Sequence, residues 1–340
     1  MSSIWDNRIS ITMFGEPNAP AMGVTISNLP SGEYINAEEL VSFMERRCIG
    51  TETRIPTPRI MSGISDERTT GAPLCAFIQN QPMALKKAEP DDVRTRYGNA
   101  DYTGAVRYRD YSDFAESSGF AYKYTAPLCF AGAVCAQILE RRGIYTGAHI
   151  SSIHNIKDNP FDTVHLSRDA VISVRNKEFP VINDRKGWLM IDDINKAGEK
   201  GESLGGVIEC AAVNVPAGIG SPLFDGLENN IAQLVFGIPG VKGLEFGAGF
   251  SSAKMTGSQN SDEFCLNERG HLVTKTNNHG GIIGGISSGM PITLNVAIKP
   301  MPKTTDGEQV ACSVPQAVPC VEAAVNIALL SHMIDYPNFC

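Results

Sequence analysis

The sequence predicts an α+β fold made of two similar halves packed into one body. The first observation is an internal echo: GVTISNLPSG at residues 23–32 resembles GVIECAAVNVPAG at residues 206–218, each an apolar alternating run followed by Asn, an aliphatic residue, Pro, a small residue and Gly. The second is helical apolar spacing after each copy, in NAEELVSFMERR and LENNIAQLVFGI. The copies start about 185 residues apart, far beyond the ~20–50 residues of a solenoid repeat, which favours internal pseudo-two-fold symmetry.

Each half then continues with the same kinds of element. An extended run, RIMSGI or VKGLEFGAGF, precedes Gly, one residue, Pro and an alternating strand, in GAPLCAFIQN or GMPITLNVAIKP. Two long apolar helices are predicted to lie between sheets, one in SSGFAYKYTAPLCFAGAVCAQILERRG with Gly143 as its C-terminal stop, the other in PQAVPCVEAAVNIALLSHMI. We expect Pro127 and Pro319 near the starts of these helices.

Length and composition indicate a globular protein. With 340 residues, of which 42% are hydrophobic, the chain can bury a large core. We predict a single domain over residues 1–340, with halves of about 1–140 and 195–340. The net charge of -8 argues against nucleic acid and anionic membranes as partners. No signal peptide and no segment of the ~20 apolar residues that span a bilayer is expected, which predicts a cytoplasmic location.

The cysteines and histidines form no recognisable metal motif. The nine cysteines are odd in number and lack CxxC spacing, and the six histidines include no HExxH. We expect reduced thiols that act as small buried side chains, because a nucleophilic cysteine needs a lowered pKa. No metal site is predicted.

Two segments carry groups suited to anionic or flat ligands. TNNHGGIIGGISSGMP, which includes Gly284 and Gly285, is either a cradle of backbone N–H groups or a flexible turn between strands. It has neither the order of a Walker A loop nor that of a dinucleotide-binding fingerprint. Arg46 and Arg47 end the first predicted helix, where they either satisfy terminal carbonyls or grip a carboxylate or phosphate.

A third segment mixes aromatic and basic residues. NADYTGAVRYRDYSDFAESSGFAYKY contains Tyr102, Arg107 and Lys123 among small side chains. It either lines a pocket for an aromatic, anionic cofactor or forms an amphipathic surface, since aromatic faces and cations suit both.

Seven motifs occur in order and together cover nearly the whole chain. They are FGE at 14–16, RR..GT at 46–51, NADYT at 99–103, GESLGGVIE....NVPAGIGSPLFDGL at 201–227, VKGLEFGAGF..AKMTGSQNSDE at 241–263, the TNNHGGIIGGISSGMPI loop, and AVPCVEA at 317–323. In order and spacing they resemble the chorismate synthase family.

The resemblance implies a β-α-β-α sandwich with internal two-fold symmetry that assembles as a homotetramer. It also implies a carbon–oxygen lyase acting on phosphates, which eliminates phosphate from 5-enolpyruvylshikimate 3-phosphate to give chorismate in the shikimate pathway of aromatic amino acid biosynthesis. Reduced FMN takes part without net redox change. By the same resemblance, Arg46 and Arg47 face the anionic substrate. The implied cofactor-binding residues are Asn260, Gly284, Gly285, Lys299 and Lys123.

The chain departs from the family pattern at the acid–base positions. Where the family has histidine in Gly-Glu-Ser-His-Gly and in His-Ala-Asp-Tyr-Thr, this chain has Asn18 and Asn99, and Val310 replaces the aspartate of Arg-His-Asp-Pro-Cys. Neither asparagine nor valine can titrate. A segment rich in flavin contacts is here SSGFAYKYT, with Lys123 as its cation, and the loop after AIKP is shortened.

Three functions therefore remain open. The first is the family elimination itself. The second is a diverged paralogue acting on another anionic cyclic substrate, its proton transfers carried by Tyr102, Lys123, Glu16, Glu308 or His279. The third is a non-catalytic homologue that keeps the assembly and binds a ligand. Binding of FMN would favour retained flavin chemistry.

Overall fold

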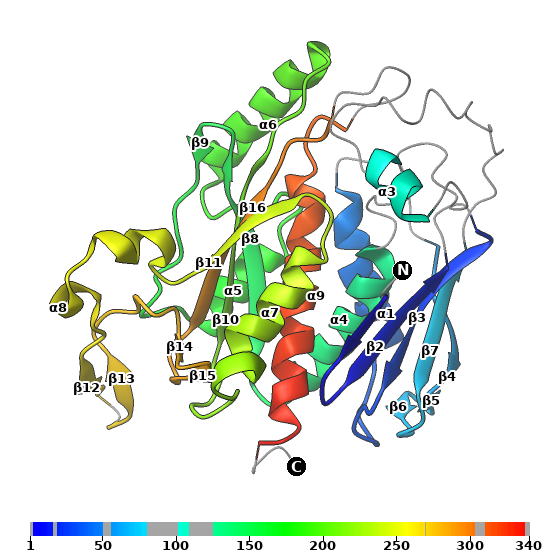
Figure 1. Ribbon diagram of the computed structural model, residues 1–340, viewed down its shortest axis with the longest axis horizontal. Helices are drawn as coiled ribbons and strands as arrows, with labels where there is room; N and C mark the ends of the chain where they lie inside the picture. The colour runs from blue at the N-terminus through cyan, green and yellow to red at the C-terminus, as the bar shows by residue number, and fades with distance from the viewer. Residues whose placement is uncertain are drawn as a thin grey trace.

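Two antiparallel five-stranded sheets frame the molecule. The computed structural model describes residues 3–15, 19–49, 56–79, 101–108, 125–268, 270–302 and 310–336 (Figure 1). The first sheet has the order β1-β2-β3-β7-β4, with bounds β1 (Ile4–Asp6), β2 (Ser10–Gly15), β3 (Ala21–Ser27), β7 (Leu74–Gln79) and β4 (Arg59–Ser62). The second has the order β11-β16-β10-β8-β9, with bounds β11 (Val241–Phe246), β16 (Ile292–Ile298), β10 (Gly206–Val213), β8 (Tyr145–Ile153) and β9 (Ile156–Lys157).

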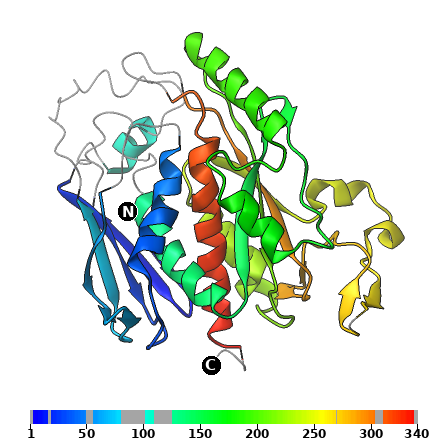
Figure 2. The same cartoon turned by 180° about the vertical axis from the view of Figure 1, so that it is seen from behind.

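Helices fill the space between the sheets and cover the second sheet from outside (Figures 1 and 2). The inner helices are α1 (Ala37–Glu45), α4 (Thr125–Glu140), α7 (Leu227–Phe236) and α9 (Val314–Met333). The outer helix α5 (Arg168–Arg175) packs on β8, and α6 (Asp184–Glu199) packs beside β9. This layering confirms the predicted β-α-β-α sandwich of the α+β class.

Shorter elements complete the described chain. They are the helices α3 (Asp101–Tyr108) and α8 (Gly257–Asn260), the 3₁₀ turns η1 (Arg46–Cys48), η3 (Leu223–Asp225) and η4 (Gly249–Lys254), and the strands β5 (Ile64–Ser65), β6 (Arg68–Thr69), β12 (Phe264–Leu266), β13 (Leu272–Thr274), β14 (Ile282–Ile283) and β15 (Ile286–Ser287). We call the part from α8 to β15 the distal arm, which projects from the second sheet in Figure 1.

Strand alternation in the second sheet separates two buried faces. In β8, Ala148 and Ile150 face the inner helices and belong to the main core. Gly147 faces α5 so closely that a Cβ there would lie 2.6 Å from Val171 Cγ1. Because side chains alternate along a strand, His149 and its cross-strand partner Glu209 also lie on the outer face.

Matched elements in the two halves confirm the predicted internal pseudo-two-fold symmetry. The order β2-β3-β7-β4 in the first sheet corresponds to β8-β10-β16-β11 in the second. At the ends of the echoed runs, Asn28 and Asn214 both adopt positive φ, at 65° and 62°, and Gly32 and Gly218 follow with φ of 83° and 100°. Asn and Gly tolerate this left-handed conformation, which explains why the echo repeats them. The proposed boundaries of the halves stay a prediction.

Helix α9 corrects two expectations. Its 20 residues are apolar and long enough to cross a membrane, although no such segment was expected, but every one of them is buried between the layers. It is therefore a core helix by position. Pro319 lies inside α9 instead of near its start, where Pro315 stands, whereas Pro127 is the third residue of α4 as expected.

Helices α4 and α9 approach most closely at a glycine. A Cβ added to Gly132 would lie 2.2 Å from Ala323 Cβ, a distance that real side chains do not reach. We expect Gly132→Ala to lower the free energy of unfolding by about 1–3 kcal/mol through overpacking. Urea denaturation followed by circular dichroism measures this. Gly257→Ala, with open space around the added methyl, is the matched control; equal stability of both variants would contradict the close crossing.

A buried ion cluster lies on the outer face of the second sheet. His149 is fully buried, with Nε2 2.7 Å from Glu209 and Nδ1 3.2 Å from Asp158. Burial lowers the pKa of His149, but the hydrogen bonds and charges of the two carboxylates outweigh it, so the pKa lies above the ordinary 6.5. The buried His149 ring lies between the two carboxylates and links β8, β10 and the loop that carries Asp158.

This cluster predicts a pH-dependent contribution to stability. A raised folded-state pKa means that the stabilisation is fully present below pH 6.5 and is lost as the pH rises through the folded value. The stability advantage of the unaltered chain over His149→Gln should therefore be largest below pH 6.5 and should shrink as the pH rises above it. Urea midpoints on both sides of pH 6.5 test it, with the exposed His154→Gln as control. An advantage that grows with pH would refute the assignment.

Candidate functional site

The turn after α1 carries two arginines and packs against α9. Helix α1 begins at the N-cap Asn36, whose side chain accepts hydrogen bonds from Glu38 N and Glu39 N, and ends at Glu45. The chain then tightens into η1, which packs against α9. We call this end, with Arg46, Arg47 and Thr125, the arginine end.

Arg46 is held by a carboxylate inside the apolar helix α9. Its Nη1 and Nη2 donate to the two carboxylate oxygens of Glu322 at 2.5 and 2.8 Å. Glu322 is fully buried and also accepts from Ala148 N of β8 at 2.9 Å. Burial lowers the pKa of Arg46, but Glu322 raises it above its ordinary value. This fork-to-fork pair therefore ties η1, α9 and the second sheet together.

Arg47 reaches across to α4. Its Nε donates to Thr125 Oγ1, at the first residue of that helix, at 2.9 Å. Arg47 and Thr125 also contribute hydrogen bonds to the Cys320 thiol, which lies one turn inside α9. The end of α1 and the starts of α4 and α9 thus meet around one guanidinium.

Residues 203 and 204 join the chain after β16 to the residues that precede α9. Ser203 Oγ donates to Met301 O at 2.5 Å, and Leu204 N donates to Ala311 O at 2.7 Å. This brings Lys299, just after β16, to the same end of the sandwich as Val310, whose side chain is 41% exposed. Lys299 and Val310 therefore lie at the same end of the sandwich as the start of α9.

Several predicted site residues lie outside the described ranges. They are Glu16, Asn18, Asn99, Lys123 and Glu308. Of the other proton carriers considered, Tyr102 is exposed on α3, and His279 lies in the distal arm with its Nδ1 2.6 Å from Asp262. The candidates for a replacement acid–base group that the structure describes therefore do not gather at one place.

The loop with Gly284 and Gly285 forms a tight hairpin in the distal arm. Both residues have positive φ, 63° and 83°, as a two-residue turn between paired strands requires. Gly285 O accepts from Leu227 N at the start of α7, and a Cβ on Gly285 would lie 2.4 Å from Ser221 O. Gly285 is therefore needed for packing, whereas a Cβ on Gly284 would meet open space.

Asp262 organises the first part of the same loop. It accepts hydrogen bonds from Thr276 Oγ1, from Asn278 N, and from both the backbone N and Nδ1 of His279, at 2.6 to 2.9 Å. Burial raises the pKa of Asp262, but these donors lower it overall. Nearby, Asn260 Oδ1 is buried and has no hydrogen-bond partner within the described part of the chain. The Asn260 Oδ1 atom can therefore accept a hydrogen bond from a ligand or from another copy of the chain.

The implied cofactor residues fall into two groups within one chain. Gly284, Gly285 and Asn260 belong to the distal arm, before β16, while Lys299 directly follows β16. A strand of seven residues spans about 20 Å, at ~3.3 Å per residue. The structure therefore brings Lys299 towards the arginine end and does not bring the distal-arm residues there.

Sequence reasoning missed the partner of Arg46. Glu322 was quoted only as part of a motif, although it is the single acidic residue within the Val314–Met333 helix. A carboxylate in an otherwise apolar, buried helix needs a cation or several donors, which is a usable signal. The contact between Cys129 and Cys320 could not be predicted from spacing, because the two residues are 191 positions apart.

The chain is similar to chorismate synthases over almost its full length. The chorismate synthase family model matches residues 9–334. Identity is 34% over 372 aligned positions with the chorismate synthase of Lancefieldella parvula, covering 99% of this chain and 98% of that protein. With that of Dehalococcoides mccartyi it is 35% over 354 positions, covering 97% and 96%. A crystal structure of chorismate synthase matches with a TM-score of 0.83 and 28% identity, covering 98% of this chain and 94% of the other. The resemblance drawn from the motifs is confirmed.

Proposed function

This chain belongs to the chorismate synthase family, and from that premise we propose that it is a phosphate-eliminating carbon–oxygen lyase, forming chorismate from 5-enolpyruvylshikimate 3-phosphate with reduced FMN. The observation that carries the proposal is the arginine end. There a guanidinium is fixed at the junction of α1, α4 and α9, at the same end of the sandwich as Lys299 and the substituted position Val310. Fixed cations at a junction of helix ends suit a substrate that bears phosphate and carboxylate groups.

We assign different tasks to the two arginines. Both terminal nitrogens of the Arg46 guanidinium donate to Glu322, so we propose that Arg46 holds η1 in place and does not contact the substrate directly. Arg47 lies across the starts of α4 and α9, and we propose that it contacts the anionic groups of the substrate. A planar guanidinium contacts phosphate or carboxylate oxygens through two parallel hydrogen bonds, which fixes orientation as well as affinity.

The residues present fit a bound flavin when two copies of the chain cooperate. The buried, unpartnered Asn260 Oδ1 can accept an N–H of a flavin ring, and Lys299 and Lys123 supply cations for its phosphate. Because Asn260 and Lys299 lie at opposite ends of β16, we propose that one copy contributes the distal arm and another the arginine end. When bound, reduced FMN supplies electron density for phosphate loss without net oxidation of the substrate.

The substituted positions define what this chain's own residues contribute. Asn18 and Asn99 can donate and accept hydrogen bonds to the substrate but cannot carry a proton, and Val310 does neither. We therefore propose that these residues position the substrate and exclude water, and that turnover is slower than with titratable groups there.

The direct test is an anaerobic assay with the full chain, reduced FMN and 5-enolpyruvylshikimate 3-phosphate. Chorismate should appear in proportion to enzyme, and Arg47→Ala should reduce kcat/KM by at least about tenfold, whereas the exposed Arg185→Ala should not. No product at high enzyme concentration would refute the proposal, and saturable FMN binding without product would point to a binding protein instead.

We further propose that the protein is a cytoplasmic homotetramer. Large apolar side chains stand exposed on η3, η4 and the distal arm, including Phe224 at 92%, Phe250 at 81% and Leu266 at 69%. Exposed apolar surface of this kind is typical of an interface between copies. Light scattering after size exclusion should give four times the mass of 36.6 kDa, and Phe224→Asp should lower it; a monomer throughout would contradict this.

A further inference from the structure

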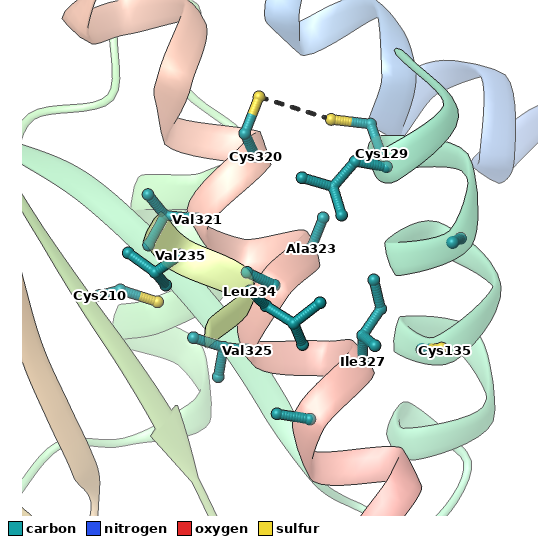
Figure 3. Packing of buried hydrophobic residues seen from close by; sticks show 14 of the residues in the cluster. Cys129, Cys135, Cys210, Leu234, Val235, Cys320, Val321, Ala323, Val325 and Ile327 are labelled. Atoms are coloured by element: carbon teal, nitrogen blue, oxygen red, sulfur yellow. Dashed lines mark hydrogen bonds between the residues drawn. The ribbon is translucent and has the colours of Figure 1, made fainter. Parts of the chain in front are cut away.

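Two thiols face each other inside the contact between α4 and α9. Cys129 is the fifth residue of α4 and Cys320 the seventh of α9, and their Sγ atoms lie 3.7 Å apart (Figure 3). Neither side chain is exposed. Within the part of the chain that the structure describes, we find no second thiol pair joined by such a contact.

The helix crossing fixes this pair. Gly132 packs against Ala323, and each of these residues lies three positions after one of the two cysteines. Residues three apart lie on the same helix face, so the close crossing brings the preceding turns together as well. Because α4 and α9 are the matched helices of the two halves, the cysteines meet at equivalent positions across the pseudo-two-fold axis.

The surroundings make the two thiols unequal. The hydrogen bond from Cys129, the charge of Arg47 and the hydroxyl of Thr125 lower the pKa of Cys320. Burial and the neighbouring Cys320 raise the pKa of Cys129 well above the ordinary value. Burial also raises the pKa of Cys312, to about 11, although a hydrogen bond from Val314 N opposes the shift. One sulfur beside a cation and a second within contact is the arrangement of an attacking and a resolving cysteine.

We propose that Cys129 and Cys320 form a reversible redox site, in which a small peroxide oxidises the pair to a disulfide that joins α4 to α9. The Cys320 thiolate attacks one peroxide oxygen, forming an S–O bond as the O–O bond breaks and hydroxide leaves. Cys129 then loses its proton and attacks the sulfenic sulfur of Cys320, so the S–S bond forms while the S–O bond breaks. Two thiols and one peroxide give one disulfide and two waters, with two electrons passing from sulfur to oxygen.

Formation of this disulfide would change the arginine end. The disulfide removes a hydrogen-bond acceptor beside Arg47 and fixes the starts of the two helices on which Thr125 and Glu322 lie. It also links residues 191 positions apart, and closing so long a loop restricts the unfolded chain strongly. Oxidation therefore stabilises the fold without needing any new surface contact.

The test treats the reduced full chain with hydrogen peroxide and maps the peptides by mass spectrometry. We expect a peptide pair linked through Cys129 and Cys320, a loss of two of the nine free thiols, reversal by dithiothreitol, and a Tm higher by about 5 °C. Cys320→Ser should abolish all four results, while Cys135→Ser, at a buried thiol elsewhere on α4, should leave them unchanged.

Two further measurements do not depend on whether a serine variant folds. Arg47→Gln should slow cross-linking about tenfold, because the cation favours the thiolate. The larger glutathione disulfide should react far more slowly than peroxide with these unexposed sulfurs. A peptide map of the unaltered chain with both cysteines still reduced, or oxidised separately without a link, would overturn the proposal.

Discussion

Replacing Glu322 with glutamine is expected to lower the free energy of unfolding by about 3–5 kcal/mol, the largest stability effect of any single change considered. The carboxamide keeps the size of the side chain but leaves the Arg46 guanidinium, whose side chain is only 17% exposed, without its counter-charge. It also weakens the acceptor for Ala148 N, so η1, α9 and β8 lose their shared contact. Burying an unpaired cation costs far more than a surface pair contributes.

Urea denaturation measures this loss, and two controls define its cause. Asp192→Asn removes the exposed pair with Lys196 and should leave the urea midpoint unchanged. The double variant Glu322→Met with Arg46→Met removes both charges and should recover most of the stability, because no charge is then left unpaired. A single Glu322→Gln variant as stable as the unaltered chain would mean that Arg46 is not held as described.

The combined variant Asn18→His, Asn99→His and Val310→Asp is expected to raise the rate of chorismate formation at least about 100-fold. Each change returns a titratable group to a position where the family has one, and general acid–base groups contribute about 10²–10⁴-fold each. Groups that act as a unit are not additive, so each single change should give much less than the combination.

Anaerobic single-turnover assays with reduced FMN compare these variants. Asn155→His, which adds a histidine on the exposed turn after β8, is the control and should not change the rate. If the combined variant binds FMN like the unaltered chain but is no faster, then proton transfer at these three positions does not limit this protein. The rates should also be measured across pH, since only variants with histidine at position 18 or 99 should acquire a new pH dependence of the rate near pH 6.5.

The fold was predictable because its repeated signals are local and have a strict backbone cause. Asn28 and Asn214 end matched strands in the left-handed region, which few residues tolerate, so the sequence repeats asparagine there. The long apolar helices were recognisable from length and composition, and they became the centre of the sandwich. The position of Pro319 inside α9 was missed because tertiary burial stabilises a helix that proline alone would interrupt.

The site was only partly predictable, because its contacts join distant parts of the chain. Arg46 and Glu322 are 276 residues apart, and nothing in local spacing selects that partner over solvent. A glycine-rich run indicates close backbone approach, but not whether the approaching group is a ligand or, as at Gly285, the chain itself. Sequence also gave no reason to place Asn260 and Lys299 at opposite ends of one strand.

Helix α9 also determines when the fold can be completed. It follows every other helix and strand that the structure describes, yet it packs against α4, α7, η1, β8 and β10, which belong to both halves. During synthesis on the ribosome, the first sheet and α4 emerge long before the helix that covers them, and exposed apolar surfaces of this kind aggregate or bind chaperones. The core therefore closes only after α9 has been synthesised and has packed against these earlier elements.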